Sequence, residues 1–145
     1  MAGVFHWLKV RSFCYATEDQ EKLNDLMVRI SGTEDFNAEM SDGHHGNSMI
    51  ILAAELKGNA ECTELFRRLG KDIIDSLLND IEKRIDDDCT FYMRLDKQAA
   101  VLERYELAHH GDVVSITCKI ASHPARKDIA TNNMRTFLEN IRGTV

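Results

Sequence analysis

The segment with the most chemically capable side chains is Thr90–Ala100, which reads TFYMRLDKQAA. Its first half has the aromatic and apolar residues that favour a β-strand. Its end places Arg94, Asp96, Lys97 and Gln98 within five positions. The group has neither a nucleophile beside a base nor the spacing of metal ligands. It does have donors suited to phosphates and base edges, so the segment predicts binding to an anion or a nucleic acid, not catalysis.

Two further bases, Arg126 and Lys127, follow the only proline, Pro124, which suits the first position of a helix. The helix dipole disfavours bases in that first turn by roughly 0.3–1 kcal/mol each, and a bound phosphate would relieve the conflict. The alternative is that both side chains extend into water at little cost.

The region Val4–Tyr15 is predicted to be a strand whose two faces differ in character. Lys9 and Arg11 lie on the outer face, opposite the face with Leu8 and Val10, and no acid interrupts them. We predict that the basic groups of this strand, of the segment after Thr90 and of the last helix converge into one patch. The predicted RNA-binding residues are Lys9, Arg11, His44, His45, Asn47, Arg94, Lys97, Gln98, Arg126 and Lys127.

The turn Asp42–Asn47, which reads DGHHGN, has three interpretations. In the first, His44 and His45 stack on RNA bases while Asn47 donates hydrogen bonds. In the second, the histidines bind a metal together with another histidine pair, His109 and His110. In the third, the glycines are required by the hairpin and the histidines are incidental. We favour the absence of a metal or other cofactor.

Carboxylates form a second cluster that has two interpretations. Asp96, Asp112 and the run 86–88 have the oxygen ligands of a magnesium-dependent nuclease. Such runs are more often turns and solvated helix ends, which is the interpretation we favour.

Composition describes an ordinary globular protein. The chain has 145 residues, of which 43% are hydrophobic and 29% charged, so we predict a single domain over residues 1–145. A net charge of −6 disfavours a general coat for nucleic acids. The chain has no apolar run of membrane-spanning length and no signal-peptide pattern, so we expect a cytoplasmic protein with no membrane partner. Its four cysteines, Cys14, Cys62, Cys89 and Cys118, are then reduced, with Cys14 and Cys118 buried.

Periodicity predicts an α+β fold. The expected strands are 4–15, 35–41, 48–57, 90–96, 101–107 and 113–122, and the expected helices are 18–31, 59–69, 72–85 and 124–142. Phe36, Ala38 and Met40 are expected to point inward, and the apolar run after Ser48 to form a central strand. These elements predict a two-layer sandwich, a mixed β-sheet with helices mainly on one face. The open strand edges favour a homodimer.

Three motifs occur in order: GHHGN at 43–47, RLDKQAA at 94–100 and HPARK at 123–127. With the opening HWLKVRSF and the ATED that follows, they resemble an archaeal family of RNA-binding proteins or predicted exosome subunits, over about Phe5 to Ile141. The resemblance implies a fold similar to the large-subunit ribosomal protein that binds 5S RNA. The candidate loop, strand-exit and helix residues occupy matching positions. Cys89 stands where a glycine or another turn former is expected.

The resemblance implies a non-catalytic accessory protein that binds RNA during processing or degradation, with the exosome, or in connection with the ribosome. Two alternatives stay open. One is a metal-dependent hydrolase that acts through His44 and His45. The other is a protein-interaction subunit that does not contact RNA.

Overall fold

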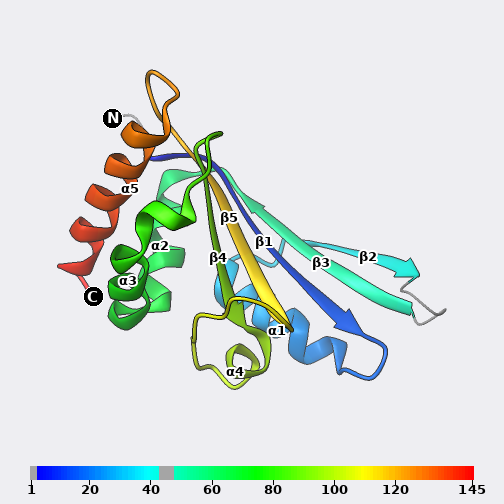
Figure 1. The fold of residues 1–145 in the computed structure, drawn as a ribbon. Helices are drawn as coiled ribbons and strands as arrows, with labels where there is room; N and C mark the ends of the chain where they lie inside the picture. The colour runs from blue at the N-terminus through cyan, green and yellow to red at the C-terminus, as the bar shows by residue number, and fades with distance from the viewer. Residues whose placement is uncertain (1–2, 43–47) are drawn as a thin grey trace.

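The computed structural model describes residues 3–42 and 48–145, and its framework is one five-stranded sheet (Figure 1). The strands are β1 (Phe5–Tyr15), β2 (Asn37–Asp42), β3 (Ser48–Leu56), β4 (Thr90–Asp96) and β5 (Val113–Ile120). Their order across the sheet is β2-β3-β1-β5-β4. Every strand pairing among the described residues is antiparallel, where a mixed sheet was expected. The predicted two-layer α+β architecture is confirmed.

The central strand β1 determines which side chains face the helices. It pairs with β3 on one side and with β5 on the other. Leu8 and Val10 are completely buried and Cys14 is nearly so, while Lys9 and Arg11 between them are exposed. Because alternate residues of a strand point to opposite faces, β1 buries one row and presents the other. The predicted burial of Cys14 and Cys118 is also confirmed.

The helices pack mainly against one face of the sheet (Figure 1). They are α1 (Gln20–Ser31), α2 (Asn59–Leu69), α3 (Lys71–Asn79) and α5 (Lys127–Arg142). Thr17 and Gln20 have the spacing of a capping box, but Asp19 caps α1 by accepting a hydrogen bond from the backbone N–H of Glu21. Gly32 ends α1 in the left-handed conformation, with φ of 77°, as its position predicts.

Four phenylalanines join the two layers. The ring of Phe66 in α2 lies 5.8 Å from that of Phe5, 5.5 Å from that of Phe137 and 6.2 Å from that of Phe91, measured between centroids. The four rings come from β1, α2, β4 and α5. Offset and edge-to-face contacts of this kind add to the free energy of burial, so this cluster fixes the helix layer on the sheet.

The structure replaces two predicted elements with shorter ones. The expected strand 101–107 is absent from the described chain: α4 (Lys97–Val101) follows β4, and a single bridge joins Leu95 to Leu107. Asp96 causes the change, because its carboxylate accepts a hydrogen bond from the N–H of Ala99 and starts a helix. The expected helix 72–85 ends as α3 at Asn79 and continues as a 3₁₀ turn, η2 (Ile81–Arg84).

The β2–β3 hairpin is confirmed, but its burial differs from the prediction. Met40 is 72% exposed and Ala38 is also exposed, so their expected burial is wrong, although the register pairs them with Ile50 and Leu52 on the helix side of the sheet. The reason is position: β2 is an edge strand that lies beyond the helix layer (Figure 1). The strand β3 is second from the edge, and its first half, including Ile50 and Ile51, is only partly buried.

Candidate nucleic-acid interface

The sheet surface that faces away from the helices, here called the open face, has basic and aromatic side chains in rows. Strand register aligns Lys9 with Thr117 of β5, and Thr117 with Tyr92 of β4. The next row joins Arg11, Ser115 and Arg94. Because directly paired residues of antiparallel strands point to the same side, these groups share one surface.

Small side chains in the middle of the rows leave a shallow depression. Ser115 and Thr117 separate the long side chains of β1 from those of β4. The hollow has a volume of about 420 Å³, and Lys9, Arg11 and Arg94 line it together with Phe13, Tyr15 and Tyr92. It therefore combines cations with aromatic rings, which are the two kinds of groups that hold single-stranded nucleic acids.

Cations lie against two of the rings on β1. The Lys9 ammonium is 4.6 Å from the centroid of Trp7, and the Arg11 guanidinium carbon is 5.1 Å from that of Phe13. Negative charge is also near, since Glu55 of β3 pairs with Lys9 in the register and Asp112 lines the hollow. Lys9, Arg11 and Arg94 are all exposed, so their charges can be reached by a ligand.

Lys97 was predicted to be an exposed RNA contact outside the core pattern, and that placement is wrong. Its side chain has no exposed surface. The ammonium contacts the Glu18 carboxylate at 2.6 Å and the Asp112 carboxylate at 2.8 Å, and it donates to the Phe13 carbonyl at 2.8 Å. All three hydrogens of the ammonium thus have protein acceptors. Lys97 therefore supports the end of β1, and we leave it out of the proposed RNA contacts.

Gln98 lies beside this ion pair. Its amide donates to the Glu18 carboxylate at 3.2 Å and to the Asp112 carboxylate at 3.0 Å. The side chain is exposed, but its donors are engaged within the protein. Gln98 therefore extends the Lys97 network at the surface.

The basic groups do not all converge, contrary to the prediction. Arg94 pairs with Ser115 near the start of β5, whereas Arg126 and Lys127 follow its end. The length of β5 between them is roughly 17 Å at about 3.3 Å per residue. Figure 1 shows α4 and the loop before α5 at opposite ends of the sheet.

The conflict predicted for Arg126 with the helix dipole is resolved locally. Arg126 is the residue before α5, and its guanidinium pairs with the Asp128 carboxylate at 2.8 Å. Asp128 itself supplies negative charge to the first turn of α5. The proposed bound phosphate is therefore not needed to balance this helix end.

The candidates His44, His45 and Asn47 lie outside the described residues. The strands on either side of them are placed by the register, in which Met49 pairs with both Ser41 and Tyr15. His109 and His110 are exposed in the turn before β5. Within residues 3–42 and 48–145, no three histidine, cysteine or acidic residues are grouped to hold a metal ion.

The carboxylates at 86–88 build a turn, which is the interpretation that the sequence favoured. Asp86 accepts hydrogen bonds from the N–H groups of Asp88 and Thr90 and from the Tyr92 hydroxyl, the last at 2.9 Å. Cys89 has φ of 61°, which explains why a glycine or another turn former was expected there. The turn orients Tyr92 at the edge of the open face.

We expect Asp86→Ala to lower the free energy of unfolding by about 1–3 kcal/mol at pH 7, because three donors lose their acceptor. Partial burial raises the pKa of Asp86, but the bonds from Thr90, Tyr92 and Asp88 outweigh it and hold the pKa below its ordinary value. The charged form therefore stabilises the protein at neutral pH, and this contribution is lost as the pH falls through the lowered pKa.

Urea unfolding at pH 7 and at about pH 3 measures the effect, with the exposed neighbour Asp87→Ala as control. The difference between wild type and Asp86→Ala should shrink at the lower pH. A difference of equal size at both pH values would contradict the role of the charged carboxylate.

The sequence-based prediction of the RNA-binding residues did not include the aromatic side chains of the open face. Tyr15 is 43% exposed and Tyr92 is 41% exposed, while Trp7 and Phe13 are partly exposed. The signal was present in β1, where Trp7 and Phe13 share the outer face with Lys9 and Arg11. Tyr92 joins them only through the pairing of β4 with β5.

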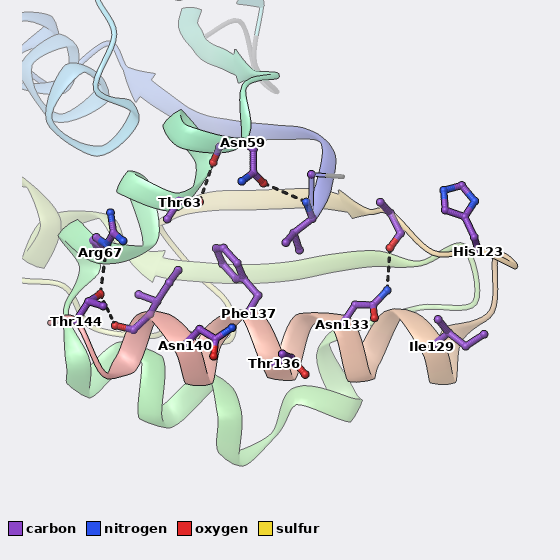
Figure 2. A pocket seen from close by; sticks show the side chains of 14 residues that line it. Asn59, Thr63, Arg67, His123, Ile129, Asn133, Thr136, Phe137, Asn140 and Thr144 are labelled. Atoms are coloured by element: carbon purple, nitrogen blue, oxygen red, sulfur yellow. Dashed lines mark hydrogen bonds between the residues drawn. The ribbon is translucent and has the colours of Figure 1, made fainter. Parts of the chain in front are cut away.

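A second hollow, of about 790 Å³, lies between α2, α5 and the start of β1 (Figure 2). Its walls are mostly apolar, and several of the asparagine and threonine side chains among them already bond to the protein. Asn59 accepts from the N–H of Val4 at 3.0 Å, and Asn133 donates to the Ala121 carbonyl at 3.1 Å. Arg67, its one Lys or Arg side chain among the described lining residues, bonds to Thr144 and Glu64. The open face is thus the more basic of the two surfaces.

Within the part of the chain that the structure describes, no helix is both long and apolar enough to cross a membrane.

Comparisons with known proteins agree with the motifs. RNA-binding protein PAB1135 of Pyrococcus abyssi is 28% identical over 151 residues, which covers 96% of this chain and 98% of that protein. The structure of Mth689, a DUF54 protein from Methanothermobacter thermautotrophicus, is similar with a TM-score of 0.81 and 26% identity, over 93% of this chain and 98% of that one. SSO0741 from Sulfolobus solfataricus, at 19% identity over 95% and 98% of the two chains, shares the fold with a TM-score of 0.72.

A family model described as RNA binding matches residues 7–120, from the first outer-face aromatic residue to the end of β5. The match includes most of β1 and all of β4 and β5, the strands that carry the open face. The resemblance predicted from the ordered motifs is confirmed, and the chain belongs to this archaeal family of RNA-binding proteins.

Proposed function

We propose that this protein is a non-catalytic RNA-binding accessory protein and that the open face of its sheet is the binding surface. The observation that carries the proposal is the row of exposed bases on β1 and β4, namely Lys9, Arg11 and Arg94, around a hollow lined with aromatic rings. Exposed basic side chains attract the phosphate backbone, and unpaired nucleobases stack on aromatic rings.

A local surface is needed because the whole chain is acidic. With a net charge of −6, the protein as a whole repels RNA, so affinity has to come from a limited region. Lys9 and Arg11 are two residues apart on β1, about 7 Å at roughly 3.3 Å per residue, which is within the Debye length of about 8 Å at physiological salt. Arg94 lies two strands from Arg11, about 10 Å away at roughly 4.8 Å per strand, which is close to that length. They can therefore act together on one segment of RNA.

The cellular role that we propose is RNA processing or degradation in the cytoplasm, in association with the exosome or a related assembly. Support comes from the resemblance of the ordered motifs and from the name RNA-binding protein given to PAB1135. The four cysteines are all buried free thiols, which supports a reducing compartment such as the cytoplasm. A homodimer is also part of the proposal, since among residues 3–42 and 48–145 the strand β2 pairs only with β3 and leaves its other edge open.

Crosslinking to cellular RNA, followed by mapping of the crosslinked peptides, tests the proposal. We expect the peptides to come from β1, β4 and β5, with Trp7, Phe13, Tyr15 and Tyr92 as the main crosslinked residues. Crosslinks confined to the helix layer would refute the open face as the interface. A protein that captures no RNA, but keeps its protein partners after ribonuclease treatment, would favour the protein-interaction alternative.

A further inference from the structure

We propose that the open face selects single-stranded RNA by stacking unpaired bases on Trp7, Phe13, Tyr15 and Tyr92. The inference rests on the proposed function, since it names the kind of RNA and the groups that recognise it. Its basis is the arrangement of rings and cations, not the number of charges.

Rings and cations occupy successive outward positions along β1. Trp7, Lys9, Arg11, Phe13 and Tyr15 are two residues apart, so the row extends about 26 Å at roughly 3.3 Å per residue. Each nucleotide has a flat base and a charged phosphate. Trp7 with Lys9, and Phe13 with Arg11, have the matching pair of groups in contact with each other. The row therefore suits a chain of several nucleotides laid along β1.

The two tyrosines are the most accessible rings, and neighbouring groups orient both. The Lys97 ammonium lies 4.7 Å from the centroid of Tyr15, and the Tyr92 hydroxyl donates to Asp86. Both rings are about two-fifths exposed, so each keeps surface for a ligand. Rings that are ordered before binding lose less conformational entropy when a base stacks on them.

Single strands are favoured over duplexes for two reasons. Bases in an A-form duplex are stacked within the helix, and its major groove is too narrow for side chains to enter, so these rings would have no base surface to cover. In addition, only three exposed basic side chains, Lys9, Arg11 and Arg94, line the hollow, so binding would release few counterions from the RNA. This limits the purely electrostatic affinity on which duplex binding would depend. Stacking adds about 5- to 150-fold in affinity for each base.

The experiment uses fluorescence anisotropy to compare the binding of a ~12-nucleotide oligo(U) with that of a duplex RNA of equal length. This length is within the range of single-strand binding sites. The test variant is Tyr15→Leu with Tyr92→Leu, which removes the rings but no charge. Its matched control is Tyr15→Phe with Tyr92→Phe, which keeps the rings. Circular dichroism and thermal unfolding establish that each variant folds.

We expect wild type to prefer the single strand and the leucine variant to bind it at least about 25-fold more weakly, since two stacked bases are lost. The salt dependence of the leucine variant should be unchanged, because no phosphate contact is removed. The phenylalanine variant should retain most of the wild-type affinity, because it keeps both rings and loses only their hydroxyls, one of which bonds to Asp86. The fluorescence of Trp7, the only tryptophan, should change when oligo(U) binds.

Equal affinity of the leucine variant and wild type for oligo(U) would overturn the inference. So would a wild-type protein that binds the duplex as tightly as the single strand. If duplex binding depends on Lys9 and Arg11, the proposed function stands without stacking. If wild type binds neither RNA, the inference and the proposed function fail together.

Discussion

Replacing Lys97 by methionine is expected to lower the free energy of unfolding by about 3 kcal/mol, because a buried ion pair loses its only cation and leaves two carboxylates facing each other. The loss lies at the low end for buried pairs because the Asp112 side chain is 37% exposed and can gain water. Methionine keeps the volume of the side chain, so a cavity does not explain the effect. Urea unfolding at neutral pH measures it.

The exposed Lys22→Met in α1 is the matched control and should change stability little. Burial lowers the pKa of Lys97, but its bonds to Asp112 and Glu18 outweigh burial and raise the pKa above the ordinary lysine value. The stabilisation by the charged form is therefore present below that ordinary value and is lost only as pH rises through the raised pKa. The difference between Lys97→Met and wild type should thus be the same at pH 7 and about pH 9. A stability equal to that of wild type would show that the charge of Lys97 does not stabilise the fold.

The second large effect is expected on RNA binding when Lys9, Arg11 and Arg94 are replaced together by alanine. Three phosphate contacts on a single strand contribute about 0.7 each to the salt slope, so the slope should fall by about 2. At roughly 0.1 M salt this corresponds to a loss of about 100-fold in affinity. Titrations of oligo(U) at several salt concentrations measure both quantities.

The control replaces three exposed lysines of the helix side, Lys22, Lys71 and Lys83, by alanine. It makes the same change in net charge, so it separates a local interface from general attraction of the protein for RNA. Equal losses in the two triple variants would contradict the open face as the binding surface. An unchanged salt slope in the variant without Lys9, Arg11 and Arg94 would show that these three side chains do not contact phosphates.

The two predictions concern neighbouring parts of one structure. Lys97 bonds to the backbone carbonyl of Phe13 and lies against the ring of Tyr15, so it supports the end of the strand that carries the interface. Lys97→Met should therefore weaken RNA binding only through the position of these rings. Variants of Lys9 and Arg11 act on the phosphates directly and should leave stability nearly unchanged, because both side chains are exposed.

Local sequence patterns determined the main elements of this protein. Alternation in Val4–Tyr15 correctly predicted a strand with one buried and one outward row, because a β-strand places alternate side chains on opposite faces. The expected helix 18–31 ends where α1 ends, at Gly32, since glycine adopts positive φ without steric cost. The ordered motifs identified the family, which the family match over residues 7–120 confirms.

Only the tertiary structure decided which polar residues are available to a ligand. Lys97 and Arg94 are three residues apart, yet Lys97 is buried by carboxylates from distant segments, one of them 79 residues away, while Arg94 is exposed. The helical period of 3.6 residues and the strand period of 2 residues predict on which face a side chain lies. They hold no information on which distant charged residue packs against it. The distance between Arg126 and Arg94 could not be predicted for the same reason, because it is set by the length of β5 and its pairing with β4. Strand register, which is fixed by core packing across the whole sheet, also places Tyr92 in the same cross-strand row as Lys9, with Thr117 between them.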